Sequence, residues 1–250
     1  MSRFFGATPA GWTFSAFSPL HWAVLAVLAI AIALTVVFRH RLRDNARVRR
    51  WLPITLMSVA LVLEVTYHVW TGVNHLDFWF NLVPLELCAI SLWLGVALVL
   101  THNRTVYEIY YFISIGALAA ILFPAFGGFG PDHFRFWHYF FDHSYTLWLN
   151  AWFLAVEGFR LRRRALLRLL VVMVPFVLVV RLVDWKFGVN YMYLAGPSDT
   201  SSPLDFLGQP PWYFVNLLIL ALVIFGLMYL VAPKEPRKPR AKPSPGAARQ

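Results

Sequence analysis

The sequence is poor in cysteine, in charge and in nucleotide-binding motifs. Its 250 residues include one cysteine, Cys88, so no disulfide can form within the chain and cysteine usage says nothing about redox compartment. Charged residues make up 14% of the chain, against roughly a quarter in soluble domains. Walker-type, Rossmann and G-x-S-x-G patterns do not occur, so nucleotide use and a serine-hydrolase elbow lack support. With 59% hydrophobic residues, a chain of this length is not a soluble domain.

The sequence contains long apolar runs, and they predict an all-α polytopic membrane protein with seven transmembrane helices. Each run is near the ~17–25 residues that a helix needs to cross the hydrocarbon core. The runs cover residues 20–38, 51–71, 84–101, 106–126, 139–157, 166–184 and 211–232. Pro84 is predicted to lie in the first turn of the third helix, where helices tolerate proline.

The domain prediction is one transmembrane domain over residues 1–233, followed by a short tail. Residues 234–250 are rich in Pro, Lys and Arg, which predicts a disordered, basic, cytoplasmic tail.

The basic residues predict the orientation. Most of the 22 Lys and Arg residues fall in the loops 38–50 and 158–168 and in the tail. The opposite side holds only Arg3, Arg135 and Lys186. Because cytoplasmic loops carry an excess of Lys and Arg, the N-terminus is predicted outside and the C-terminus in the cytoplasm. The net charge of +10 is spread in short blocks between apolar runs, which predicts contact with membrane phospholipids and no binding of nucleic acid.

In this orientation the ionisable residues of the helices gather in the outer half of the membrane. An ionised side chain in hydrocarbon costs on the order of 2.5–3.5 kcal/mol, so it is usually retained for pairing or for function. The candidate set is His21, Glu64, His68, Glu86, Cys88, His143, Arg181, Asn190, Tyr191 and Asp205. Ion pairs that only hold helices together, such as Arg181 with Glu64, are the alternative reading of the same residues.

Cys88 and His143 are the candidate catalytic pair, because a thiol and an imidazole at matched depth suit a nucleophile and its base. The competing interpretation is that Cys88 is a small hydrophobic core residue, as most buried free cysteines are. His133 and His138 fall in a predicted Gly/Pro-broken loop. No tight second ligand pair accompanies them, so no metal and no other cofactor is predicted.

Three stretches resemble one known family. They are Pro84-Leu85-Glu86-Leu87-Cys88, the run Gly116 to Pro124, and the loop that holds Asn190-Tyr191-Met192-Tyr193-Leu194 and Leu204-Asp205-Phe206-Leu207-Gly208. This pattern resembles the YwaF family of bacterial integral membrane proteins, which is similar to the eukaryotic transmembrane protein 164. The resemblance covers nearly the whole chain, and the last loop is its most specific part.

The resemblance implies a Cys-dependent acyltransferase acting on ether phospholipids, with distant similarity to androgen-induced membrane hydrolases that use Thr and His. The family's cysteine falls on Cys88 and its histidine on His143. The chain departs from the family pattern at three places: Glu86 stands where a His is expected, Gly196-Pro197 where Lys-Pro is common, and Gln209-Pro210-Pro211-Trp212 where a second Trp is usual.

The leading hypothesis is therefore a membrane-embedded lipid acyltransferase or lipid-ester hydrolase in the outer leaflet. Asn190, Tyr191 or His68 would donate to the oxyanion, and Arg181 would hold a lipid phosphate. The alternative is a solute transporter or receptor-like membrane protein without covalent chemistry. A transporter would need polar residues through both halves of the membrane, and the helices have few of them in the inner half. The acyl donor and acceptor, the choice of transfer or hydrolysis, and the oligomeric state stay open.

Overall fold

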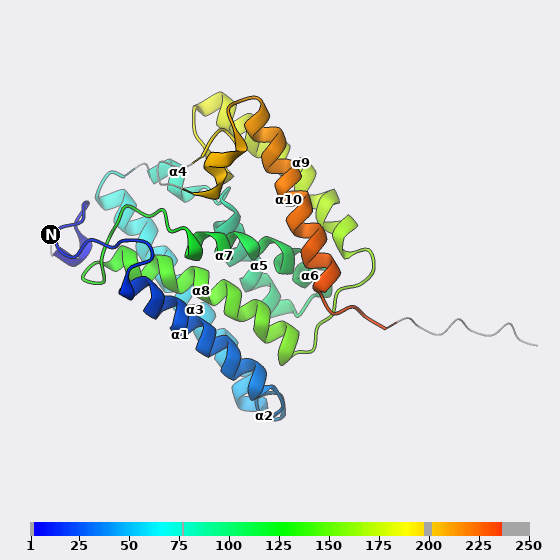
Figure 1. The fold of residues 1–250 in the computed structure, drawn as a ribbon. Coiled ribbons are helices and arrows are strands. Elements are labelled where there is room, and N and C mark those ends of the chain that lie inside the picture. Colours follow the sequence, from blue (N-terminus) through cyan, green and yellow to red (C-terminus); the bar gives the residue numbers. More distant parts are fainter. Residues whose placement is uncertain (1–2, 77, 198–201, 237–250) are drawn as a thin grey trace, which may run out of the picture.

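The computed structural model describes residues 3–76, 78–197 and 202–236, and these residues form helices and connecting loops (Figure 1). The helices are α1 (Pro19–Val37), α2 (Arg39–Asp44), α3 (Ala46–Val73), α4 (Phe78–Leu82), α5 (Leu87–Thr101), α6 (Arg104–Ile113), α7 (Ile115–Leu122), α8 (Phe134–Ala155), α9 (Ala165–Phe187) and α10 (Trp212–Val231). Three short 3-10 helices are η1 (Arg3–Phe5), η2 (Tyr191–Tyr193) and η3 (Pro203–Leu207). The predicted all-α class is confirmed.

Six segments of the described chain are long and apolar enough to cross a membrane, which confirms a polytopic membrane protein. They are Pro19–Val37, Ala46–Val73, Phe80–Thr101, Arg104–Leu122, Ala165–Phe187 and Trp212–Val231. The remaining predicted crossing, over residues 139–157, corresponds to α8, which has 22 residues but is too polar to be counted with the other six.

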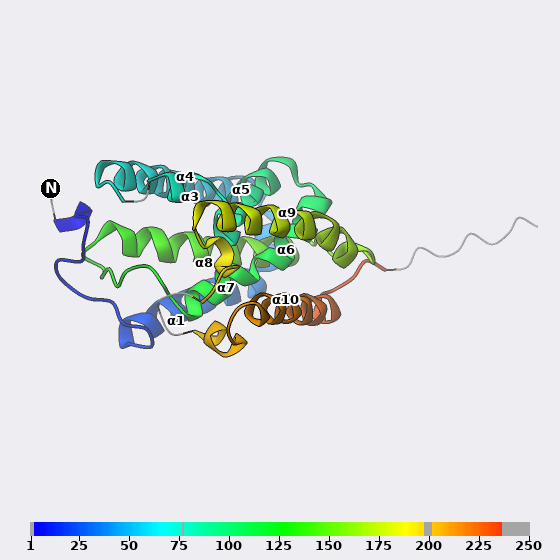
Figure 2. The ribbon, with the colours of Figure 1, turned by 90° about the horizontal axis from the view of Figure 1, so that it is seen from above.

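Helix α8 lies at the centre of the bundle. It packs against α1, α3, α5 and α7, and in Figure 2 it runs between α3 and α1. Twelve of its 22 side chains are buried, among them Trp152, Leu149 and Phe153. A helix surrounded by protein needs no lipid-facing apolar surface, which is why its sequence can be less apolar than those of the other spans.

The start of α8 differs from the prediction by five residues. The helix begins at Phe134 instead of residue 139, because the His133 side chain caps it by accepting a hydrogen bond from the backbone N–H of Arg135 at 3.0 Å. His138, predicted in a loop, is therefore a buried helical residue. The first turns of α8 are polar, so no apolar run in the sequence indicated that they belong to the helix.

The predicted 38–50 loop is also largely helical. It forms α2 and the first turn of α3, where the Asn45 side chain accepts a hydrogen bond from the N–H of Val48 at 3.1 Å. Helix α3 thus starts five residues before its apolar stretch, and its added turn carries Arg47, Arg49 and Arg50.

The third predicted span is broken before its cysteine. Residues 83–86 separate α4 from α5, so the prediction that Pro84 lies in the first turn of the long helix is wrong. Proline disfavours helical geometry in the residue before it, and here the N–H of Leu85 donates to the carbonyl of Val83 at 2.8 Å. The new start makes Cys88 the second residue of α5.

One buried ion cluster ties α6 to the link between α8 and α9. Glu108 is fully buried, and its two carboxylate oxygens accept hydrogen bonds of 2.6–2.9 Å from the guanidinium groups of Arg162 and Arg168. The side-chain hydrogen bond to Glu108 raises the pKa of Arg162 above its usual value. Two charged hydrogen-bond donors thus neutralise the one buried carboxylate.

The segment after α10 joins the same end of the bundle. The N–H of Leu161 donates to the carbonyl of Pro233 at 3.1 Å, and the N–H of Glu235 donates to the carbonyl of Leu161 at 3.0 Å. Arg104 pairs with Glu235. Residues 237–250 of the predicted tail lie outside the described residues. We call this the basic end of the bundle; it comprises residues 39–50, 102–108, 157–168 and 229–236.

The basic end is predicted to face the cytoplasm, because it collects the Lys- and Arg-rich blocks. A protease-cleavable tag placed after Gln250 should resist protease added to intact cells and be cut in inside-out vesicles. Cleavage of the tag in intact cells would reverse the predicted orientation.

Candidate functional site

Cys88 lies at the amino-terminal end of α5, at the opposite end of the bundle from the basic end. Glu86 is the N-cap residue, and the first helical hydrogen bond runs from the N–H of Ile90 to the carbonyl of Glu86 at 3.0 Å. The N–H groups of Leu87, Cys88 and Ala89 therefore have no acceptor within the helix. The positive end of the helix stabilises negative charge that develops on the Cys88 sulfur during a reaction. The sequence prediction placed Cys88 a full turn deeper, where this effect is weaker.

His143 lies on α8 with its side chain buried. Its Nδ1 atom is 2.6 Å from the carbonyl oxygen of Tyr139, and its ring packs on the Tyr139 ring at a centroid distance of 4.4 Å. A carbonyl oxygen can only accept, so Nδ1 carries the proton in the neutral ring and Nε2 has a free lone pair. This is the tautomer that a general base needs.

Cys88 and His143 share neighbours. Tyr139 contacts the His143 ring and is close enough to Cys88 to interact electrostatically. Glu64 interacts electrostatically with both residues. No hydrogen bond joins Cys88 and His143 in the described part of the chain. Catalytic hydrogen bonds often tighten only when substrate binds, so the missing bond is compatible with a nucleophile and its base.

A cluster of acids and imidazoles joins α3 to α8 beside this pair. Glu64 accepts from Nε2 of His138 at 2.9 Å and lies 3.2 Å from Nε2 of His68. Asp142 lies 3.0 Å from the same Nε2 of His138. Two buried atoms of the cluster have no partner among the described residues, Oδ1 of Asp142 and Nδ1 of His68. The predicted pair Glu64 and His68 is thus one half of a four-residue network.

The cluster has the spacing of a metal site, since Glu64, His138 and Asp142 offer ligand atoms within 4.8 Å of one another. The contact of the other ring nitrogen of His138, Nδ1, indicates that Nε2 carries a proton and does not bind a metal. A guanidinium nitrogen of Arg135 lies 2.8 Å from Nδ1 of His138. A histidine that binds metal through Nε2 carries a proton on Nδ1, which would then face the N–H of Arg135. The arrangement fits an Nε2–H group shared between two carboxylates.

The loop after α9 covers the start of α5. Glu86 accepts a hydrogen bond from the backbone N–H of Met192 at 3.0 Å, and Asp184 accepts one from the N–H of Tyr191 at 2.9 Å. The hydroxyl of Tyr191 donates to the carbonyl of Phe80 at 2.8 Å, and burial raises the pKa of that hydroxyl. Glu86, which stands where a His was expected, therefore anchors this loop two residues from Cys88.

Asn190 holds the same loop in shape. Its amide nitrogen donates to the carbonyl of Gly196 at 3.0 Å, and its amide oxygen accepts from the N–H of Ala195 at 2.9 Å. The side chains of Asn190 and Tyr191 thus bond to backbone, and the structure shows no donation from them towards Cys88.

Three other predicted site residues lie outside the cluster. His21 uses both ring nitrogens, at 2.7 Å from the carbonyl of Ile121 and 2.9 Å from the N–H of Phe17. Arg181 lies over the ring of Phe214, at 5.8 Å from its centroid. Asp205 caps η3 by accepting from the N–H of Ser202 at 2.9 Å.

The sequence-based set omitted His138, Asp142 and Tyr139, all on α8. His138 and Asp142 are four residues apart, which places both on one helix face. That spacing would have indicated them if residues 134–138 had been assigned to the helix.

These features define a multi-pass α-helical membrane protein with a thiol, an imidazole and a buried acid–histidine network near one end of its bundle. Residues 16–229 match the TMEM164 family, and the chain belongs to that family. Searches of curated proteins and of solved structures gave no match.

Proposed function

We propose that this protein is a lipid acyltransferase or lipid-ester hydrolase of the bacterial plasma membrane, with Cys88 as nucleophile and His143 as base. One observation supports it above all: Cys88 lies at the positive end of α5 while the His143 ring presents a free Nε2. The resemblance to the YwaF family and to Cys-dependent acyltransferases of ether phospholipids points to the same two residues. Membrane phospholipids are the proposed substrates.

The first half of the reaction forms a thioester. Nε2 of His143 takes the thiol proton of Cys88, and the thiolate attacks the carbonyl carbon of a lipid ester. The C–O bond of the ester breaks, and the departing alkoxide takes the proton back from the His143 imidazolium. The lyso-lipid leaves and the acyl group stays on Cys88.

The second half regenerates the enzyme. A hydroxyl of a lyso-lipid, or of water, gives its proton to His143 and attacks the thioester carbon. The C–S bond breaks and the thiolate of Cys88 recovers the proton from His143. A lipid acceptor gives transfer, and water gives hydrolysis.

The oxyanion that forms in both halves needs fixed donors. The first-turn N–H groups of α5 fit this role, since they have no acceptor within the helix and those of Cys88 and Ala89 interact with the Cys88 sulfur. They replace Asn190 and Tyr191, which sequence reasoning suggested and whose side chains hold the covering loop.

Transport is the competing function, and the basic end of the described chain gives it little support. The buried acids there are paired, Glu108 with Arg162 and Arg168, and Glu157 with Arg49. Paired acids offer no free group to continue a polar path from the Cys88 side.

Mass spectrometry of the Cys88 peptide tests the proposal. After incubation of the purified protein with mixed phospholipids, the peptide should carry a fatty-acyl mass that neutral hydroxylamine removes. His143→Asn should greatly reduce that adduct, because the thiol loses its base. An unmodified Cys88 in wild-type protein whose lipid pool nevertheless turns over would rule out the acyl-enzyme.

A further inference from the structure

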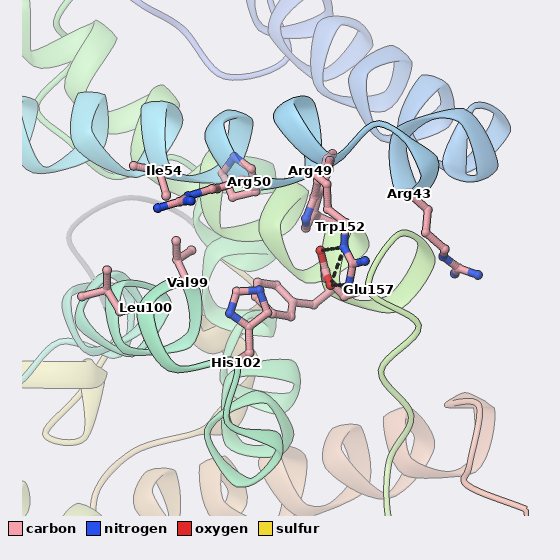
Figure 3. Close-up of a pocket in the computed structure, with 12 residues that line it drawn as sticks. Arg43, Arg49, Arg50, Ile54, Val99, Leu100, His102, Trp152 and Glu157 are labelled. Carbon is pink, nitrogen blue, oxygen red and sulfur yellow. Dashed lines mark hydrogen bonds and ion pairs between the residues drawn. The ribbon is translucent and has the colours of Figure 1, made fainter.

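A pocket lies at the basic end, between the start of α3, the end of α5 and the end of α8 (Figure 3). Its volume is about 520 Å³, within the ~300–1,000 Å³ range of small-molecule sites. Cys88 and Leu100 are separated along α5 by twelve residues, which is about 18 Å at ~1.5 Å per residue. The pocket is therefore distinct from the proposed catalytic site.

The charge of the pocket is unbalanced towards the positive. Arg43, Arg49 and Arg50 line it together with a single carboxylate, Glu157. The Glu157 carboxylate accepts hydrogen bonds of 2.6, 3.0 and 3.1 Å from the guanidinium group of Arg49. Arg43 donates to the carbonyls of Ala155 and Val156 at the end of α8. These contacts use the one acid of the pocket and leave two arginines without a counter-charge in it.

Arg50 is the arginine best placed to take a ligand. Its guanidinium group lies over the ring of Trp51, at 5.3 Å from the ring centroid, and no carboxylate among the described residues pairs with it. A guanidinium group matches the oxygens of a phosphate with two parallel hydrogen bonds.

The indole of Trp152 provides a second indication of a ligand. Trp152 lines the pocket and is fully buried, and its Nε1–H has no partner among the described residues. A buried N–H without an acceptor is destabilising, and an acceptor from a bound molecule would remove this cost.

The remaining wall of the pocket is apolar and faces the membrane. Ile54 on α3 lies across from Val99 and Leu100 on α5 (Figure 3). Leu100 is 65% exposed, as expected for a side chain that meets lipid. A pocket with a positively charged end and an apolar end that faces lipid suits an amphipathic molecule, which has an anionic group and an apolar chain.

We propose that this pocket binds an anionic phospholipid, with its phosphate at Arg50 and an acyl chain along Ile54, Val99 and Leu100. Basic pockets between transmembrane helices on the cytoplasmic side are suited to such headgroups. A free phosphate satisfies the arginine but leaves the apolar wall unused, so the lipid is the occupant that the whole pocket favours.

The test is lipid binding by the full-length protein, measured by native mass spectrometry in detergent. Phosphatidylglycerol should bind more tightly than phosphatidylcholine, and Arg50→Gln should weaken phosphatidylglycerol binding about tenfold, the loss expected for one charge-assisted hydrogen bond. Arg47→Gln is the matched control, because Arg47 is an exposed arginine on the same turn outside the pocket. Trp152→Phe, which removes the N–H and keeps a ring, should also weaken binding.

Each other result overturns the proposal. Equal losses in Arg50→Gln and Arg47→Gln would indicate general attraction to a basic surface. Competition by inorganic phosphate at the same concentration as phosphatidylglycerol would indicate a free-anion site. Unchanged phosphatidylglycerol binding in both Arg50→Gln and Trp152→Phe would place the lipid elsewhere.

Discussion

Cys88→Ser is expected to lower lipid turnover by orders of magnitude while the melting temperature stays the same. Serine preserves size and hydrogen-bonding capacity, but its hydroxyl needs far stronger base assistance than a thiol in order to attack a carbonyl. Cys88→Ala should abolish turnover, with a stability cost of about 1 kcal/mol at most. The measurement is release of fatty acid or lyso-lipid from labelled phospholipid by the purified protein, with thermal unfolding followed in the same detergent.

Ser91→Ala provides the matched control for Cys88. Ser91 lies one turn further along α5, is fully buried, and bonds only to the carbonyl of Leu87. Its replacement removes a small polar side chain from the same helix without touching the thiol, so turnover should persist. Wild-type turnover in both Cys88 variants would leave the covalent mechanism without its nucleophile.

Glu108→Ala is expected to cause the largest loss of stability, about 3 kcal/mol, the lower end of the range for a broken buried ion pair, because Arg162 and Arg168 are 36% and 30% exposed. Removing one partner of a buried ion cluster leaves the remaining charges uncompensated, and here two guanidinium groups share one carboxylate. Unfolding by denaturant in detergent micelles, monitored by tryptophan fluorescence, measures the loss. The free energy of unfolding should fall while the helix content of the folded state stays unchanged.

Glu235→Ala is the control for the ion cluster. Glu235 also pairs with an arginine at the basic end, but both partners are partly or well exposed. Exposed ion pairs contribute about 0–1 kcal/mol, so this variant should remain near wild-type stability. Equal effects of the two substitutions would mean that burial of Glu108 contributes nothing beyond a surface pair.

The sequence predicted well wherever a helix meets lipid. The crossings over α1, α9 and α10 came within a few residues of their observed bounds, because lipid contact demands a continuous apolar run that is visible in one sequence. The crossing predicted over residues 139–157 missed the first five residues of α8, because its polar first turns carry no such signal. The start of α5 was missed because a break of four residues inside an apolar run barely alters its hydropathy.

The structure places two of the predicted site residues, Glu64 and His68 on α3, in one cluster and leaves those of the last loop outside it. Glu64 and His68 could be paired from their four-residue spacing, and the structure adds His138 and Asp142 from the neighbouring helix. Asn190, Tyr191 and Asp205 share a depth with the cluster, yet their hydrogen bonds go to backbone groups nearby. The depth of a residue in the membrane can be estimated from the sequence and limits which residues can be in contact. Which of them are in contact depends on how the helices pack, and the sequence alone does not give this.

The order of helices along the chain also has a consequence for biosynthesis. A segment as polar as α8 is a poor candidate for entering the membrane unaided. Its principal packing partners, α1, α3, α5 and α7, all precede it in the chain and are therefore synthesised first. When α8 emerges from the ribosome, the groove that receives it can already be assembled, whereas α9 and α10 are apolar enough to insert afterwards on their own. We therefore expect the helices that surround α8 to insert first and the polar helix α8 to pack between them afterwards.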